Sequence, residues 1–255
     1  DSQAPAIASV TRLPLVPGLN QPVTVTATLV AGVNISSVKL FHRFNGSPYV
    51  SLDMNLSGSS YTAVIPGVSG TGLVEYYVQV TGTNGKSSFE PATAPAKAKN
   101  YLLNTDPLPL LVINEFMAFN TSCCPDNSSG TNEFDDWIEI YNKGNVAVNI
   151  ADWYLSDDKN DPFKDKISSD NPSATLIPPG GFLVLWADGQ PSQGPVHLNF
   201  SLSNTGEDVG LYYIDGRKVD DYTFGTQSED VSWGRVMNGA ATWKSFASPT
   251  PGQSN

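Results

Sequence analysis

Residues 23–29 read VTVTATL, a stretch in which apolar and polar side chains alternate with a period of two. Such alternation is typical of a β-strand that buries one face, because successive side chains of a strand point to opposite sides. The same period recurs in VKLFHRF at residues 38–44 and in VEYYVQV at residues 74–80. We find no long segment with the 3.6-residue period of an amphipathic helix. The pattern therefore predicts an all-β protein.

Turn-forming dipeptides separate the alternating runs of the chain. They are Asn45-Gly46, Asn84-Gly85, Asp215-Gly216 and Asn238-Gly239. Each pair supplies the positive φ angles that a tight type I′ hairpin turn requires. Strands that recur at a spacing of about 8–12 residues, with such turns between them, are typical of β-sandwiches.

Length and composition support this interpretation. The chain has 255 residues, and a prior of about 150 residues per domain predicts one or two domains. It contains 22 Gly and 19 Pro but only 15% charged residues, which disfavours helix bundles and coiled coils, and its 10% aromatic content argues against disorder. Apolar runs such as residues 182–187 are too short for a membrane helix. Because the chain starts at Asp1 without a visible signal peptide, we expect a mature or trimmed piece of an exported protein.

Charge and tryptophan are distributed unevenly along the chain. Residues 1–100 contain four acids and six bases, a net charge of +2, whereas residues 101–255 contain 21 acids and eight bases, a net charge of −13. All five Trp also lie in the second part. The difference predicts two domains with separate cores, residues 1–104 and 111–255, joined by a short proline-rich linker at residues 105–110. A domain at −13 repels phosphate backbones, so no nucleic-acid partner is expected.

The first domain has the strand count of an immunoglobulin-like sandwich. We expect strands near residues 6–13, 22–30, 36–45, 48–54, 60–66, 73–82 and 86–101. Seven strands in about a hundred residues is the immunoglobulin-like number. The pattern Tyr-x-Val-x-Val-x-Gly-x-Asn at residues 76–84 resembles a late strand of fibronectin type III domains, although residues 1–100 lack the early core Trp of that family.

The second domain carries a series of distinctive blocks. They are VINEF (112–116), DWIEIYN (136–142), DWYLSDD (152–158), IPPGGFLVLWA (177–187), NFSLSNTGE (199–207) and VSWGR (231–235), followed by PTPG at 249–252. This ordered set resembles the bacterial form of the lamin tail domain across roughly residues 110–255. The resemblance implies an immunoglobulin-like sandwich, so the whole chain is expected to be all-β, with two such sandwiches in tandem. It also implies an accessory module of secreted or surface proteins, often beside nucleases or other hydrolases.

The strands of the second domain predict where its aromatic side chains lie. Trp137, Glu139 and Tyr141 should share one strand face. Asp136, Ile138 and Ile140 should share the opposite face. Residues 182–187 lack polar alternation, which predicts a central strand buried on both faces. We expect the Trp side chains to form core; the alternative is a sugar-stacking platform, which needs coplanar exposed rings.

Acidic side chains gather where strands of the second domain are expected to end. If successive strands run antiparallel, strand 112–119 ends where strand 135–142 begins, and strand 151–156 ends at that same pole. The pole then collects Asp126, Glu133, Asp135, Asp136, Asp157, Asp158 and Asp161. Oxygen ligands on loops suit calcium, which is therefore a candidate although no cofactor is required. The alternative is a solvated acidic rim whose Asp side chains cap turns.

Cysteine and histidine offer little for catalysis. Cys123 and Cys124 are neighbours, so two arrangements are open: a vicinal disulfide that rigidifies the loop, or two free thiols. His42 and His197 lie in different domains and in no recognisable catalytic motif, which disfavours a Ser-His-Asp triad. A single adjacent Cys pair does not supply the ligand spacing of a zinc site.

Taken together, these features predict a non-enzymatic accessory or adhesion module of a secreted or cell-surface bacterial protein. Its partner would be an extracellular protein or polysaccharide, bound by residues that the sequence does not identify. The first alternative is a calcium-stabilised carbohydrate-binding module of a larger secreted hydrolase. The second is a hydrolase that uses the acidic pole itself, although a fold alone never licenses an activity.

Overall fold

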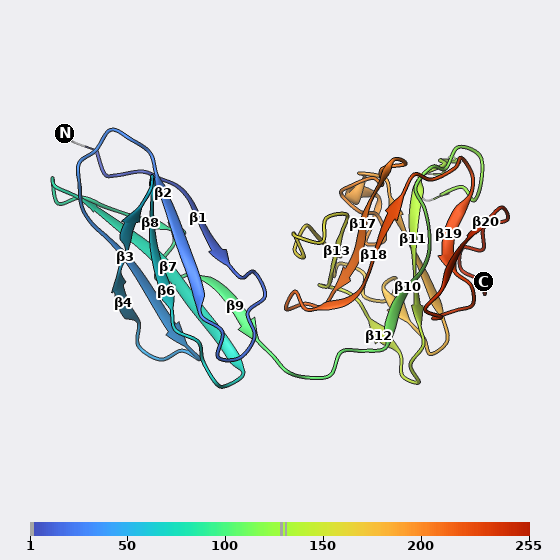
Figure 1. Ribbon diagram of the computed structural model, residues 1–255, viewed down its shortest axis with the longest axis horizontal. Helices are drawn as coiled ribbons and strands as arrows, with labels where there is room; N and C mark the ends of the chain where they lie inside the picture. The colour runs from blue at the N-terminus through green and yellow to red at the C-terminus, as the bar shows by residue number, and fades with distance from the viewer. Residues whose placement is uncertain (1–2, 128–129, 131) are drawn as a thin grey trace. The chain divides into compact units, whose positions relative to one another are not determined.

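The computed structural model describes residues 3–127, 130 and 132–255. The chain divides into two compact units, Asp1–Asp106 and Pro107–Asn255, and the division falls within the proline-rich segment at residues 105–110. Both units are built from antiparallel strands (Figure 1), which confirms the all-β prediction. Among the described residues, the only helix is the short 3₁₀ turn η1 (Pro191–Gln193). None of the described helical structure is long and apolar enough to cross a membrane.

The first unit is an immunoglobulin-like sandwich of two sheets. Its described strands are β1 (Ile7–Leu13), β2 (Val23–Leu29), β3 (Ile35–Phe44), β4 (Val50–Asp53), β5 (Asn55–Ser57), β6 (Ser60–Ile65), β7 (Gly72–Gly82), β8 (Ser87–Glu90) and β9 (Lys99–Leu103). One sheet has the order β1-β2-β6-β5; the other has the order β4-β3-β7-β8, with β9 also paired to β7.

Alternation along β2 produces the core of this unit as the sequence predicts. Val23, Val25 and Ala27 are fully buried, while the threonines between them point outward. The strand expected at residues 86–101 is wrong as a single element, because β8 ends at Glu90 and β9 begins only at Lys99. Pro91 and Pro95 lie in the gap and have no N–H to donate to a ladder, which explains the interruption.

The second unit is also an immunoglobulin-like sandwich. Its described strands are β10 (Leu111–Met117), β11 (Asp136–Asn142), β12 (Val148–Asn149), β13 (Tyr154–Ser156), β14 (Asp165–Lys166), β15 (Leu176–Ile177), β16 (Phe182–Ala187), β17 (Gly206–Tyr212), β18 (Lys218–Gly225), β19 (Ser232–Arg235) and β20 (Trp243–Phe246). The two main sheets have the orders β16-β11-β10-β19-β20 and β14-β13-β17-β18, and a short β12–β15 ladder stands apart. Side chains such as Ile138, Ile140 and Leu211 fill the core of this unit.

The strand at the centre of the first of these sheets differs from the prediction. β16 is an edge strand, and four of its six residues are only half-buried, so the prediction of a central strand at residues 182–187 is wrong. β10 takes the central place, and all seven of its residues are buried, Asn114 and Glu115 included. Hydropathy misleads here because two polar side chains interrupt the most deeply buried strand.

Candidate functional site

Three of the seven acids named from the sequence meet at one end of the second unit. Carboxylate oxygens of Asp126, Glu133 and Asp135 lie within 4.8 Å of one another. An isolated antiparallel bridge joins Asp126 to Glu133, with N–O distances of 2.8 Å and 2.9 Å in the two directions. Asp135 immediately precedes β11. Backbone hydrogen bonds and the start of β11 therefore bring these three carboxylates together.

Two side chains that the sequence analysis did not assign complete this group. Asp188 directly follows β16, and its Oδ2 lies 2.6 Å from Nδ1 of His197. The same ring nitrogen lies 3.9 Å from Oδ2 of Asp126, so Asp126, Asp188 and His197 form a second group that shares Asp126 with the first. We call these five residues the acid–histidine cluster.

The carboxylates of the acid–histidine cluster influence one another electrostatically. Burial raises the pKa of Asp135, and the negative charges of Asp188, Glu133 and Asp126 raise it further. Oδ2 of Asp135 is also buried without a hydrogen-bond partner. A group of mutually repelling, shielded carboxylates around an imidazole favours a bound cation and offers no obvious nucleophile.

The remaining four predicted acids do not join this cluster among the described residues. Asp136 turns toward the Asn120 N–H at 3.2 Å, and burial raises its pKa to about 6. Asp157 forms an ion pair with Lys164, while Asp158 and Asp161 accept turn hydrogen bonds from the N–H groups of Asn160 (2.8 Å) and Phe163 (3.2 Å). The prediction of a single acidic pole is wrong because β13, which precedes Asp157, pairs with β17 in the opposite sheet.

Strand register was the signal that could have identified Asp188. In the antiparallel pair of β11 and β16, Asp136 faces Ala187. Asp188, the residue after Ala187, therefore lies beside Asp135. His197 carries no such local signal. It is placed by a bridge to Trp186, with the Leu198 N–H donating to the Trp186 carbonyl at 2.8 Å.

A hollow of about 460 Å³ lies beside the acid–histidine cluster. It is lined by residues 118–120, 134–136, 187 and 201–204. Its lining combines the Phe134 side chain, which is 39% exposed, with Asn, Asp and Ser groups. The hollow therefore offers the exposed ring of Phe134 and several hydrogen-bonding groups to a ligand.

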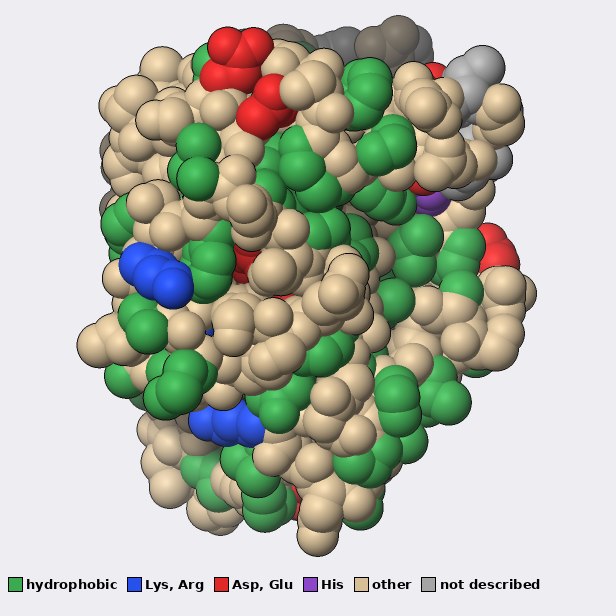
Figure 2. Space-filling view, turned by 90° about the vertical axis from the view of Figure 1, so that its right-hand side faces the viewer, with side chains coloured by type: hydrophobic (Ala, Val, Ile, Leu, Met, Phe, Trp, Pro, Cys, Tyr) green, Lys and Arg blue, Asp and Glu red, His purple; other side chains and the backbone are tan. Residues whose placement is uncertain are grey.

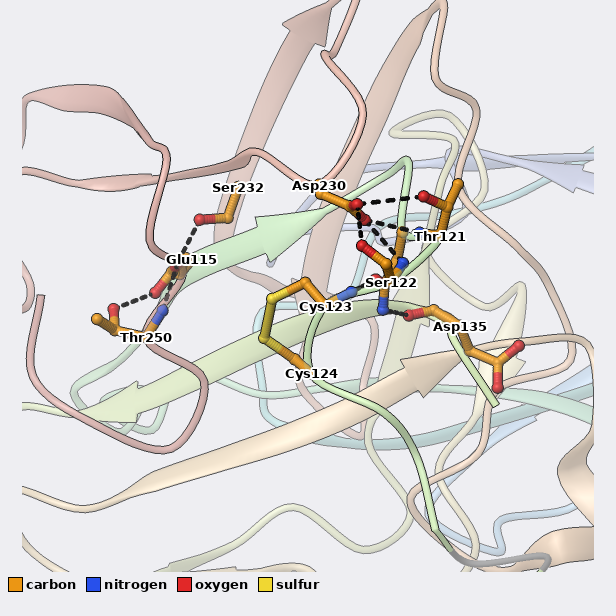
Figure 3. The surroundings of a disulfide bond; sticks show 10 residues. Glu115, Thr121, Ser122, Cys123, Cys124, Asp135, Asp230, Ser232 and Thr250 are labelled. Carbon is orange, nitrogen blue, oxygen red and sulfur yellow. Dashed lines mark hydrogen bonds between the residues drawn. A yellow bond between two sulfur atoms is a disulfide. The ribbon is translucent and has the colours of Figure 1, made fainter. Parts of the chain in front are cut away.

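The two cysteines lie in the loop that leads to Asp126. Their sulfur atoms are bonded to each other, and the Cα atoms are 3.8 Å apart (Figure 3). Asp230 holds the preceding residues, because its carboxylate accepts hydrogen bonds from the backbone N–H groups of Thr121 (2.8 Å) and Ser122 (3.0 Å) and from both hydroxyls. These bonds, led by that of the Ser122 hydroxyl, lower the pKa of Asp230 to about 2.

Two further carboxylates, Glu115 and Glu139, are completely buried in neighbouring strands. Glu115 accepts hydrogen bonds from the Ser232 hydroxyl and from the backbone and hydroxyl of Thr250, and Glu139 accepts them from Asn114 (2.9 Å) and the Gly252 N–H (2.6 Å). Figure 3 shows Thr250 and Ser232 converging on Glu115. The C-terminal segment thus covers the outer face of β10 and β11, and these acids serve structure.

Comparison with known proteins assigns the second unit. The family model of the lamin tail domain matches residues 109–226. Residues 109–226 form a lamin tail domain. A search of curated proteins found no match to the chain. The resemblance noted in the sequence blocks is therefore confirmed for this part of the chain.

The folded unit that contains the lamin tail domain extends beyond the matched residues. β19 and β20 follow residue 226, yet β19 pairs with β10 at the centre of the sheet. Thr250 and Gly252, later still, bind the buried Glu115 and Glu139. Residues after 226 therefore complete this sandwich.

We call the second unit (Pro107–Asn255) the lamin tail unit, and its aromatic side chains pack within the fold. Trp137 and Trp153 are buried. Trp243 stacks on Tyr222 at 4.1 Å between ring centroids, and the indole N–H of Trp233 donates to the Tyr222 hydroxyl at 2.9 Å. Trp137 and Trp153 are buried, Trp243 is covered by Tyr222, and Trp233 is held by a hydrogen bond, so these four tryptophans do not form the coplanar exposed platform that sugar stacking requires.

Replacing both cysteines with serine is expected to change the unfolding free energy of the lamin tail unit by less than about 1 kcal/mol. A bond between adjacent residues closes almost no loop, so it removes little entropy from the unfolded chain. Asp230→Ala should destabilise the unit more, because it removes the hydrogen bonds that hold Thr121 and Ser122. Urea denaturation followed by tryptophan fluorescence measures both effects. A larger loss for the cysteine variant than for Asp230→Ala would contradict this ranking.

Proposed function

We propose that this chain is a non-catalytic accessory or adhesion module of a secreted or cell-surface bacterial protein, and that it binds an extracellular protein or polysaccharide. The hollow at the loop end of the lamin tail unit carries this proposal. Loops at the ends of a rigid sandwich are where binding residues concentrate. An exposed aromatic ring among convergent polar groups is the usual composition of a ligand site.

The disposition of the carboxylates supports binding over catalysis. Glu115 and Glu139 lie under the C-terminal segment and have no exposed surface, so a substrate does not reach them. The four predicted acids outside the acid–histidine cluster have other structural partners, such as Lys164 at Asp157. We therefore assign no catalytic residue.

One face of the molecule carries no dominant charge. The face in Figure 2 carries scattered acidic and basic side chains among apolar and neutral polar groups, without one dominant charged patch. The second part of the sequence is strongly acidic overall, which disfavours nucleic acid as the partner. A glycan or a neutral to basic protein surface fits these properties better.

The lining of the hollow favours the polysaccharide among these partners. Phe134 offers a ring on which a sugar can pack, and the exposed Ser201 and Asn204 offer polar groups that can bond to hydroxyl groups. The second candidate function, a carbohydrate-binding module stabilised by calcium within a larger secreted hydrolase, follows from the same observation. In that version the carboxylate oxygens of Asp126, Glu133 and Asp135 beside the hollow would hold the ion.

Binding of the whole chain to a panel of polysaccharides and extracellular proteins tests the proposal. We expect saturable binding, and we expect Phe134→Ala to weaken it at least about tenfold, since burying an aromatic ring contributes strongly to affinity. Leu176→Ala is the matched control, because Leu176 is exposed and lies outside the hollow. Equal binding by wild type and Phe134→Ala would remove the hollow as the site. Release of soluble sugars from a bound polysaccharide would contradict the non-catalytic assignment.

A further inference from the structure

The acid–histidine cluster combines carboxylates with a buried imidazole. Asp126 and Glu133 come from the bridged loop before β11, and Asp135 directly precedes that strand. Asp188 directly follows β16, and His197 follows η1. The ligand atoms fall into two overlapping groups, each within 4.8 Å, that share Asp126. Each group is thus compact enough to hold a single ion.

Backbone hydrogen bonds fix the positions of these side chains. Asp126 and Glu133 exchange both of their backbone hydrogen bonds, and Asp188 Oδ1 accepts the Gln190 N–H at 2.8 Å. The His197 N–H donates to the Gly194 carbonyl at 3.1 Å. Such support holds ligands in place before a metal arrives, as in other metal sites.

Burial disfavours the ionised forms of the side chains in this cluster. The side chains of Asp126, Asp188 and His197 are only 4%, 0% and 1% exposed. Buried charges in proteins are normally paired or coordinated to a metal. Lysine partners are found on other acids, such as Asp208 with Lys159.

The direction of the imidazole identifies the class of ion. Nδ1 of His197 points to the carboxylates of both Asp188 and Asp126, so a cation between them meets one nitrogen and two oxygens. Imidazole is a ligand for zinc and other transition metals, whereas calcium takes oxygen ligands. The two cysteines are joined to each other and supply no thiolate.

We propose that Asp126, Asp188 and His197 bind one divalent transition-metal ion of the Zn²⁺ and Mn²⁺ class, with Glu133 and Asp135 as adjoining oxygen donors. The ion takes the place of the proton between Nδ1 and Asp188, and the ring proton then resides on Nε2. This site goes beyond the binding function proposed above and does not depend on it. Because the site ties together the loop before β11 and the segment after β16, metal binding is expected to stabilise the hollow beside it.

Titration of the intact, oxidised chain with Zn²⁺, Mn²⁺ or Ca²⁺, after treatment with a chelator and dialysis, tests the proposal by calorimetry. We expect one Zn²⁺ or Mn²⁺ per chain, bound more tightly than Ca²⁺. His197→Gln and Asp188→Asn should each weaken binding by about 10–100-fold, as loss of a ligand or its direct partner does elsewhere. His42→Gln is the matched control, because it removes the only other histidine and lies in the first unit. It should bind as the wild type does.

A direct readout on the wild-type chain does not depend on whether a variant folds. Co²⁺ bound through an imidazole and carboxylates gives a visible absorption band that is shifted and stronger than the weak band of Co²⁺ in water, and Zn²⁺ should abolish it by displacement. Absence of such a band, or tighter binding of Ca²⁺ than of Zn²⁺, would overturn the proposal, as would unchanged affinity in a folded His197→Gln chain. Partner binding measured in the presence of chelator separates this outcome from a failure of the proposed function.

Discussion

Phe116→Ala is expected to lower the unfolding free energy of the lamin tail unit by about 4 kcal/mol. Phe116 is completely buried on the central strand β10. Its ring centroid lies 4.6 Å from that of Phe224 and 6.0 Å from that of Trp243, so it connects the two sheets of the sandwich. Removing the ring leaves a cavity that β-strands held by ladders on both sides cannot close, which adds to the lost transfer free energy.

Tryptophan fluorescence isolates this effect because all five Trp belong to the second unit. Phe134→Ala is the matched control, since its exposed side chain contributes little to the core, and it should change the unfolding free energy by less than about 1 kcal/mol. The unfolding midpoint of the first unit, followed by circular dichroism, should stay unchanged in both variants. Equal midpoints for the two variants would show that Phe116 is not the centre of this core.

Much of the fold follows from side-chain period and turn chemistry. Alternation in VTVTATL placed Val23, Val25 and Ala27 in the core because a one-sided strand needs no information beyond its own sequence. β10 is different: Asn114 and Glu115 are as buried as Ile113 because the C-terminal segment covers the outer face of the sheet. A third layer of this kind depends on contacts more than a hundred residues apart, which local periodicity does not register.

The candidate site shows the same limit. Acid-rich loops predicted Asp126, Glu133 and Asp135, since acids at strand ends converge whenever the strands pair. Asp188 needed the register of β11 with β16, and His197 needed the bridge to Trp186. Assigning Asp157 to the same pole failed because β13 belongs to the other sheet. Pairing partners, more than residue types, decide which acids meet.

The stability of the lamin tail unit is expected to fall by on the order of 3 kcal/mol between pH 5 and pH 8.5. Burial raises the pKa of Glu139 from its ordinary value of 4.5 to about 8, and the hydrogen bonds from Asn114 and Gly252 offset part of that effect. Folding carries this carboxyl group into a fully buried position between β10 and the C-terminal segment.

The sign follows from the protons that each state binds. Above pH 4.5 the unfolded chain releases the Glu139 proton, while the folded chain keeps it until the pH approaches 8. The contribution to stability is therefore fully present below the unfolded pKa and is lost as the pH rises through the folded pKa. Asp136, whose pKa burial raises to about 6, acts in the same direction over the lower part of this range.

Glu139→Gln separates the contribution of Glu139 from that of other groups. The glutamine is neutral at every pH, so the decline in stability above pH 6 should largely disappear. At pH 5 the variant should be about as stable as the wild type, because the protonated carboxyl group and the amide each keep one carbonyl oxygen for the donors at Asn114 and Gly252. Glu229→Gln, a change at an exposed glutamate of the same unit, is the control and should keep the wild-type slope. Urea denaturation monitored by tryptophan fluorescence at each pH, in the presence of chelator, supplies the slopes. A wild-type unit that is equally stable at pH 5 and pH 8.5, or a Glu139→Gln variant with the full wild-type slope, would show that Glu139 is ionised in the folded state across this range.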